Sequence, residues 1–287
     1  MRFVEIKLLD LKTRSLRVEL DGPSASQVNA IRRTLLADLP KLAIEDVEFH
    51  LGPIRDEATG KDYDSSTSMF DEAVALRLGL LPIPTDLGQF RRRSECTCKG
   101  EGCVHCQVMY SIDKKGPCTV YARDLVPLGD ASLATLEPEV PIVRLGARQA
   151  LLAYATAVVG SSREHSKWQV AHAVGVQPKA EVRIQKKPGC SDSCLKKLAA
   201  NAPTGLLEYA SGKLSYTGGS DPSKAVLLIG AQRLCEHGSL QVKLSDTEHF
   251  LSFDTDGSLS ARDSFRYALK DLKRRFEELR EAVQALP

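Results

Sequence analysis

The chain has 287 residues, of which 43% are hydrophobic and 26% charged, and its formal net charge is +2. That length and apolar content suffice for one large domain or several ordinary ones, while the near-neutral charge argues against an autonomous nucleic-acid-binding protein. No apolar run approaches the roughly 20 residues of a membrane-spanning helix, and the N-terminus lacks the apolar stretch of a signal peptide. We therefore expect a soluble, cytoplasmic protein without a membrane partner.

Strands and helices alternate in the first part of the chain. The elements predicted from apolar spacing are a β-hairpin at 3–22, a helix at 24–39, a strand at 42–52, a polar loop at 52–70 and a helix at 71–79. Ser24 or Ser26 can cap the first helix, and Pro40 follows its end.

The helix at 71–79 begins with two adjacent carboxylates, Asp71 and Glu72. Adjacent residues on a helix do not face each other, so the two are not an acid–base pair. In the first turn their charge suits the free backbone N–H groups. We expect Asp71 to cap this helix and to pair with Arg77.

Four cysteines are concentrated in the stretch "CTCKGEGCVHC". They are Cys96, Cys98, Cys103 and Cys106. The C-x-C-x4-C-x2-C spacing can bring four thiolates to the corners of a tetrahedron around Zn²⁺, and such a closed site is structural. Gly100 and Gly102 permit the tight turn between the pairs. Lys99 and the arginines at 91–93 can balance the negative charge, and His105 is expected to be exposed. Free or disulfide-linked thiols and an iron–sulfur cluster are the alternatives.

In the second part of the chain, strands are predicted at 108–113 and 118–125, and a strand or a helix at 148–162. A compact segment rich in Gly, Ser and Lys follows at 188–240. The last element is a helix at 260–286, where Asp263 near the start suits the helix dipole. Its apolar stripe comprises Phe265, Leu269, Leu272, Phe276, Leu279 and Val283. Taken alone, the stripe indicates an intrachain or dimer core.

His165 and Trp168 lie together in "EHSKWQ", but no nucleophile or acid stands nearby in a catalytic arrangement. We interpret this segment as a structural loop under a partner subunit, with His165 hydrogen-bonded. The sequence also contains no Walker loop and no polymerase-type cluster of aspartates. We therefore predict no catalytic residues in this chain.

Four stretches together resemble one family. They are "NAIRRTLLADLPKLAIEDVEF" (29–49), "DEAVALRLGLLPI" (71–83), "EHSKWQVAHAVGV" (164–176) and the C-terminal amphipathic helix. In this order they are similar to the α-like subunit of archaeal DNA-directed RNA polymerase that is denoted D. That subunit is related to the larger α-like subunits of eukaryotic polymerases and to bacterial α. Ser166 and Val170 depart from the family's usual Ala and Pro.

The resemblance implies an α+β fold with a discontinuous α-like dimerisation domain, and it makes the ambiguous 148–162 segment a strand. The implied domains are a dimerisation domain formed by 1–45, 174–186 and 241–287, an inserted β-rich domain with a zinc loop at 46–173, and a ferredoxin-like insert at 187–240. The cysteine spacing also resembles the zinc loop of the eukaryotic relatives.

The implied function is non-catalytic assembly of a DNA-directed RNA polymerase. The chain would dimerise with the small α-like subunit L and form a platform for the two large catalytic subunits. The small zinc-bearing subunit N would lie nearby, and DNA would be met only through the complex. The implied interface residues are Arg32 and Arg33, towards a large subunit, and Phe265, Leu269, Leu272 and Phe276, towards the small partner.

The ferredoxin-like insert lacks most of the cysteines of that fold. Alignment on its conserved phrases would place cluster cysteines at Asp192, Leu195, Leu198, Ala202, Ala225, Leu228, Ala231 and Cys235, and only the last is a cysteine. Since a cubane cluster needs four thiolates, we predict a fold without a cluster, with a core of Leu195, Leu198, Leu227 and Leu228. A three-iron cluster or a disulfide, Cys190–Cys194 or Cys194–Cys235, remains the alternative. Cys118 is expected to be a buried thiol.

Two functions of other classes compete with polymerase assembly. An iron–sulfur redox protein or redox sensor would use the ferredoxin-like segment, and the missing cysteines argue against it. A zinc-dependent nucleic-acid adaptor would use "FRRRSECTCKGEGC", and the near-neutral charge argues against that.

Overall fold

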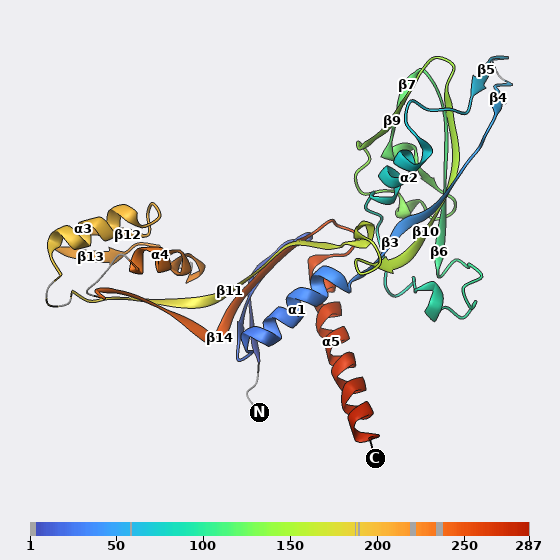
Figure 1. Cartoon of the computed structure of the whole chain (residues 1–287). Helices are drawn as coiled ribbons and strands as arrows, with labels where there is room; N and C mark the ends of the chain where they lie inside the picture. Colours follow the sequence, from blue (N-terminus) through green and yellow to red (C-terminus); the bar gives the residue numbers. More distant parts are fainter. Residues whose placement is uncertain are drawn as a thin grey trace. The chain divides into compact units, whose positions relative to one another are not determined.

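Figure 1 shows a computed structural model of the chain, which describes residues 4–57, 59–186, 188, 190–218, 222–233 and 238–286. Contacts divide the chain into two compact units. The first unit is built mainly from Leu16–Arg32 and Ala173–Phe253, and the second mainly from Arg33–His172 and Asp254–Pro287. No helix among the described residues is long and apolar enough to cross a membrane.

The first unit contains a four-stranded sheet made from both ends of the chain. Its strands lie in the order β1 (Glu5–Leu11), β2 (Ser15–Asp21), β14 (Leu240–Thr255) and β11 (Ala171–Ile184). The predicted N-terminal hairpin is confirmed, since β1 and β2 pair antiparallel. Leu16, Val18 and Leu20 alternate with less buried residues along β2 and point into the core.

Helix α1 (Ala25–Ala37) lies within the predicted segment 24–39 and ends two residues before its predicted end. The Gln27 amide donates to Ser24 Oγ at 3.4 Å, and the Ser24 amide donates to Gln27 Oε1 at 2.8 Å. This reciprocal capping satisfies backbone donors that a helix start leaves free. The apolar face of the helix is buried through Val28, Ile31 and Leu35.

A small module lies between β11 and β14 in the first unit. It consists of α3 (Asp192–Asn201), the hairpin of β12 (Leu207–Ala210) and β13 (Lys213–Tyr216), and α4 (Ile229–Gln232). Its core contains Leu195, Leu198 and Leu228, as predicted. The prediction for Leu227 is wrong, since this side chain is 54% exposed. Leu227 and Leu228 are successive residues of a 3-10 helix, whose three residues per turn direct them about 120° apart.

The second unit is centred on a sheet with strand order β3 (Pro40–Phe49), β10 (Ala150–Ser161), β6 (Gln107–Lys115) and β8 (Val126–Pro127). The ambiguous segment at 148–162 is the strand β10, in agreement with the resemblance. It pairs with β3 on one side and β6 on the other. Most of its residues are buried, which is why its sequence reads as a continuous apolar run without a strand period.

Two smaller sheets complete the second unit. The strands predicted at 118–125 include β7 (Cys118–Tyr121), which pairs with β9 (Pro141–Leu145). The expectation of a plain loop at 52–70 is wrong in part, because β4 (Pro53–Arg55) and β5 (Asp62–Asp64) form a short hairpin there. Only Ile54 and Tyr63 supply larger apolar side chains in these strands, so the composition gave no strand signal.

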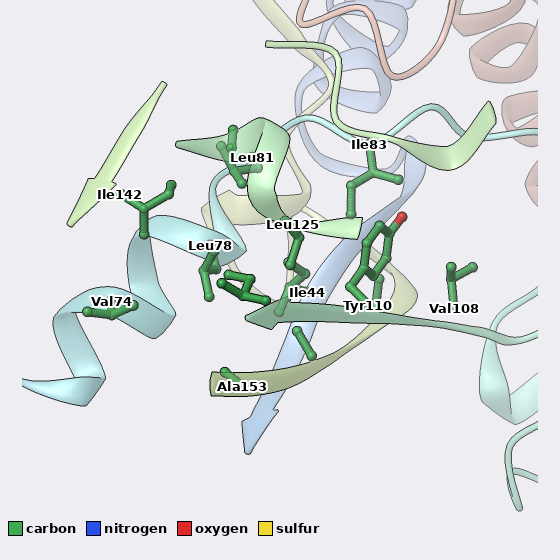
Figure 2. Close-up of a cluster of buried hydrophobic side chains, with 14 of the residues drawn as sticks. Ile44, Val74, Leu78, Leu81, Ile83, Val108, Tyr110, Leu125, Ile142 and Ala153 are labelled. Atoms are coloured by element: carbon green, nitrogen blue, oxygen red, sulfur yellow. The ribbon is translucent and has the colours of Figure 1, made fainter. Parts of the chain in front are cut away.

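Helix α2 (Asp71–Gly79) packs Val74 and Leu78 into the main core of the second unit, which Figure 2 shows. The expected capping is not observed. The N-cap is Phe70, without a side-chain hydrogen bond, and Arg77 Nη1 donates to the Ile142 carbonyl oxygen at 2.6 Å. Asp71 and Arg77 are six residues apart, so a helix turns their side chains to different faces.

Helix α5 (Ala261–Gln284) is the longest helix and begins at Ser260, whose Oγ accepts from the Asp263 amide at 3.1 Å. Its first turns are anchored through the buried side chains of Ala261, Phe265 and Ala268. From residue 276 onward every described side chain of the helix is exposed. The predicted apolar stripe is therefore covered at one end of α5 and open at the other.

Candidate metal centre and contact surfaces

The four clustered cysteines converge in the second unit. Their sulfur atoms all lie within 4.8 Å of one another. Three Sγ–Sγ distances are 3.5 Å for Cys96–Cys103, 3.6 Å for Cys98–Cys106 and 3.9 Å for Cys103–Cys106. Zn–S bonds of about 2.3 Å in a tetrahedron require S–S edges of about 3.8 Å. The four cysteines thus fit one tetrahedral metal ion.

Backbone geometry in the loop supports this convergence. Gly100 and Gly102 have φ of 89° and 96°, and Lys99 between the cysteine pairs also has a positive φ, of 55°. Positive φ favours glycine because a side chain then crowds the backbone. The Cys103 amide donates to Cys106 Sγ at 3.2 Å, an interaction that stabilises negative charge on sulfur.

The four sulfurs differ in electrostatic environment. A backbone hydrogen bond from Gly102 and one from the Cys96 side chain lower the pKa of Cys98 to about 6. Burial raises the pKa of Cys106 to about 12. Four thiolates this close repel one another unless a cation lies between them. A cation bound among the four sulfurs would offset this repulsion, so the donor set suits a metal ion.

The arginines before the cysteine loop differ in what they contact. Arg93 Nη2 donates to Gln107 Oε1 at 3.0 Å, beside the loop, whereas Arg92 pairs with Glu164 at 2.5 Å. Arg91 is exposed, and so is His105, as predicted. Within the described residues, no other group of three or more Cys, His, Asp or Glu side chains is arranged to hold a metal.

The small module between β11 and β14 offers no comparable donor set among its described residues. Leu195, Leu198 and Leu228, at positions where the alignment requires cysteine, are at most 1% exposed and pack against one another in the module core. Cys190 and Cys194 form no disulfide with each other, and Cys235 lies outside the described residues. The residues present do not fit a four-cysteine cluster. Cys118 is only half-buried, with its Sγ 3.4 Å from the Lys115 carbonyl oxygen.

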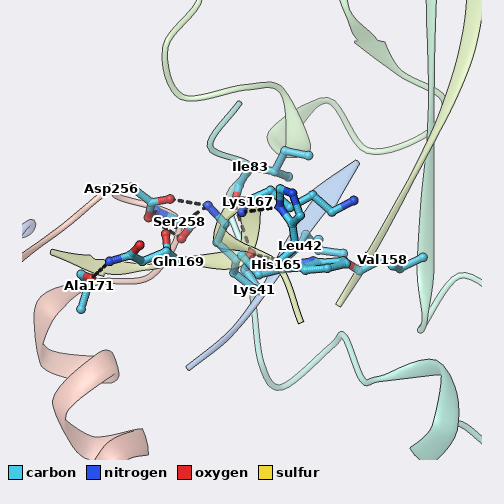
Figure 3. Close-up of polar contacts among 12 residues, drawn as sticks. Lys41, Leu42, Ile83, Val158, His165, Lys167, Gln169, Ala171, Asp256 and Ser258 are labelled. Carbon is cyan, nitrogen blue, oxygen red and sulfur yellow. Dashed lines mark hydrogen bonds and ion pairs between the residues drawn. The ribbon is translucent and has the colours of Figure 1, made fainter. Parts of the chain in front are cut away.

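The segment around Trp168 is a structural loop of the second unit (Figure 3). His165 Nδ1 accepts from the Lys167 amide at 3.0 Å, and Trp168 Nε1 donates to the Val158 carbonyl oxygen at 3.1 Å. Trp168 is 5% exposed. A Cβ on Gly160 would lie 2.4 Å from its ring, so the indole requires a glycine there. The predicted hydrogen-bonded role of His165 is confirmed.

Lys41 is a buried charge that the sequence analysis missed. Its side chain is 3% exposed, and its Nζ donates to Asp256 Oδ2 at 2.6 Å (Figure 3). The same nitrogen lies 3.5 Å from the Gln169 carbonyl oxygen. A buried ammonium group needs such partners. The three residues are remote in sequence, so no local pattern could have revealed the contact.

The predicted interface residues differ in accessibility. Arg33 is exposed, while Arg32 is half-buried and its Nε donates to Asn29 Oδ1 at 2.9 Å. Along α5, Phe265 is only 7% exposed, Leu269 and Leu272 are half-buried, and Phe276 is 63% exposed. Leu279 and Val283 are 58% and 57% exposed. A partner would therefore gain most by covering the stripe from Phe276 onward.

Comparisons with known proteins assign the chain to a family. Residues 64–176 match the family model described as the RNA polymerase Rpb3/RpoA insert domain. The chain is 39% identical over 280 residues to DNA-directed RNA polymerase subunit Rpo3 of Thermoplasma volcanium, covering 98% of this chain and 99% of the relative. The chain belongs to the Rpo3 family of DNA-directed RNA polymerase subunits.

Two other Rpo3 proteins extend the comparison. The protein of Picrophilus torridus is 39% identical over 278 residues, which cover 97% of this chain and 99% of the relative. That of Methanosarcina acetivorans is 32% identical over 279 residues, which cover 96% and 97%. The matched insert domain contains both the cysteine cluster and the Trp168 loop. Helix α5 lies outside it.

A network of charges that sequence reasoning missed holds α5 in this Rpo3-family chain. Asp38 pairs with Arg163 and, at 2.7 Å, with Arg275, while Asp271 forms an ion pair with Arg275 at 2.6 Å and accepts a hydrogen bond from Arg274 at 2.7 Å. Both carboxylates are nearly buried, at 6% and 5% exposure. Burial raises the pKa of Asp38, but hydrogen bonds from Arg163 and Arg275 outweigh it and lower the pKa.

Proposed function

We propose that this chain is the α-like assembly subunit of an archaeal DNA-directed RNA polymerase, the one denoted D, acting in the cytoplasm and contributing no catalytic residue. It would dimerise with the small α-like subunit L, and the dimer would form the platform for the two large catalytic subunits, with the zinc-bearing subunit N nearby. Near full-length similarity to Rpo3 proteins supports the polymerase role.

The proposed dimerisation domain comprises 1–45, 174–186 and 241–287, with 46–173 and 187–240 as inserts. The pairing of β2 with β14, from opposite ends of the chain, supports this division. The proposed contact with a large subunit uses Arg32 and Arg33. An exposed guanidinium such as that of Arg33 suits carboxylates or carbonyl oxygens of a partner.

The observation that carries the proposed dimerisation is the exposed apolar stripe of α5, where Phe276 is 63% exposed. Stripes of this kind on a helix are normally buried against another element. Phe265, Leu269 and Leu272 would continue the contact towards the anchored end of α5.

Substitution Phe276→Asp tests the dimer. We expect it to weaken binding of the full chain to the purified small α-like subunit by roughly tenfold or more, because a carboxylate would be buried in an apolar contact. Isothermal titration calorimetry measures the change. Leu51→Asp is the matched control, since Leu51 is 77% exposed elsewhere in the second unit. Equal binding by both variants and the unmodified chain would refute the proposed role of α5.

We further propose that Cys96, Cys98, Cys103 and Cys106 bind one structural Zn²⁺. Their all-sulfur donor set and separations support zinc, which accepts four thiolates without an open position for water. The ion would hold the loop that joins Phe90 and β6. The ferredoxin-like module would carry no cluster, because leucines fill the positions where ligands would stand.

Elemental analysis of the anaerobically purified chain tests both proposals. We expect about one zinc per chain, without iron or inorganic sulfide. Cys98→Ser should lose the zinc and lower the thermal midpoint. Cys118→Ser should retain the zinc, since Cys118 lies outside the cluster. Stoichiometric iron with sulfide would instead support the iron–sulfur redox function.

A further inference from the structure

The exposed end of α5 carries a charge pattern that specifies what kind of helix can cover it. Apolar residues recur with a seven-residue pattern along the stripe, at Leu269, Leu272, Phe276, Leu279 and Val283. Alternating spacings of three and four residues describe the seam of a helix pair. In such a pair, the residues that flank the seam lie opposite the flanks of the partner helix.

One flank of this seam is uniformly basic. It comprises Arg266, Lys273 and Arg280, each seven residues from the next and each exposed. The other flank comprises Ala268, Arg275 and Ala282. Arg275 on that flank is already held by Asp38 and Asp271 at 2.7 and 2.6 Å. The charge open to a partner is therefore positive and lies on one side.

The carboxylates of the exposed half lie away from the seam. Glu277, Glu278 and Glu281 fall on the remaining faces of the helix at 100° per residue. Lys273 has only a weak partner in Glu277, at 3.7 Å with both side chains largely exposed. An exposed pair of this kind contributes little, so Lys273 can exchange it for a carboxylate on a partner.

We propose that the partner helix on α5 carries acidic residues beside its apolar stripe, facing Lys273 and Arg280. This inference rests on the proposed dimerisation with the small α-like subunit and specifies its chemistry. The same pattern disfavours a second copy of α5. In an antiparallel pair of identical helices, the basic rows of the two helices would face each other. In a parallel pair, each basic row would face the other flank of its partner, where Ala282 offers no charge and Arg275 is already paired with Asp38 and Asp271.

A lipid surface is a poorer occupant than an acidic helix. Helices that lie on anionic membranes have a polar face rich in Lys and Arg. From residue 273 to residue 284, α5 has four basic residues, Lys273, Arg274, Arg275 and Arg280, and three acidic ones, Glu277, Glu278 and Glu281. The mixed polar face favours a protein partner whose charges match the basic row.

Charge reversals in the full chain test the inference. We expect Lys273→Glu and Arg280→Glu each to weaken binding to the purified small α-like subunit by roughly threefold to tenfold. The dependence of the dissociation constant on salt should also decrease. Lys270→Glu is the matched control, because Lys270 is exposed on the same helix but outside the seam and its flanks. We expect its affinity to equal that of the unmodified chain.

The outcomes separate this inference from the function on which it rests. If Phe276→Asp weakens binding but Lys273→Glu and Arg280→Glu bind as well as Lys270→Glu, the acidic-helix inference is overturned and the proposed dimer stands. No binding by the unmodified chain would overturn both. A homodimer through α5 in sedimentation, or binding to phosphatidylglycerol vesicles that the reversals abolish, would assign α5 to a different occupant and overturn the inference.

Discussion

At the scale of single residues, a buried histidine makes the first unit sensitive to pH. His249 in β14 is 2% exposed, and its Nδ1 has no hydrogen-bond partner among the described residues. Burial lowers the pKa of His249 below its usual 6.5, and Asp246 opposes the shift. The folded chain therefore takes up a proton at this site less readily than the unfolded chain does.

We expect the free energy of unfolding to fall as pH decreases through about 6.5, by at most about 1.4 kcal/mol per pH unit from this group. The contribution of neutral His249 to stability is fully present above that pH, where the imidazole is neutral in both the folded and the unfolded chain. Urea unfolding between about pH 5 and 8 measures the slope. His249→Phe should flatten it, whereas His172→Gln, at an exposed histidine, should not. An unchanged slope in His249→Phe would contradict this assignment.

At the scale of elements, a capping side chain explains where two helices begin, but not where a third one begins. Ser24 and Ser260 accept hydrogen bonds from amides in the first turns of α1 and α5. Helix α2 begins at Phe70 without such a bond. It is positioned instead by the burial of Val74 and Leu78, and the carboxylates of its first turn stabilise the helix only through its dipole.

Removal of the cap of α5 should weaken the chain measurably. We expect Ser260→Ala to lower the free energy of unfolding by about 1 kcal/mol, because the Asp263 amide loses its acceptor at the start of the helix. Chemical denaturation followed by circular dichroism gives the value. Ser260→Thr keeps the hydroxyl and should retain most of the stability. If Ser260→Thr lowered the free energy of unfolding as much as Ser260→Ala, the cause would be a packing defect rather than a lost cap.

At the scale of the whole molecule, charges from distant parts of the chain meet in the second unit. Arg275 forms ion pairs with both Asp38 and Asp271, so residues more than 230 positions apart share one guanidinium. Lys41 and Asp256 form a similar long-range pair. The first contact ties the middle of α5 to Asp38, just before β3, and the second ties the segment before α5 to β3.

Asp271→Asn should destabilise the chain by about 1–2 kcal/mol, because two arginines lose a charged partner that is nearly buried. Solvent around the arginines limits the loss. Asp38→Asn should act similarly. The double variant should lose less than the sum of the two, since Arg275 is common to both. A double-mutant cycle from unfolding midpoints checks this, and strict additivity would show that the two carboxylates act independently.

Much of the candidate site could be predicted because its determinants are local. Cys96 to Cys106 lie within one short loop, so their spacing alone indicates a tetrahedral donor set. The stripe of α5 is likewise a property of one helix. The sequence also showed Leu195, Leu198 and Leu228 at positions where a cluster would need cysteines, and their burial agrees with the predicted core.

The sequence by itself determined the strand and helix order, the cysteine loop and the resemblance to a polymerase subunit, since each depends on neighbouring residues or on motifs in order. Only the tertiary structure decided that Leu227 is exposed, that Arg77 binds a carbonyl of β9 and that Asp38, Arg275 and Asp271 form one network. It also decided which part of the α5 stripe remains open. Burial and ion pairing depend on which segments meet in space, and that information is not contained in any local pattern.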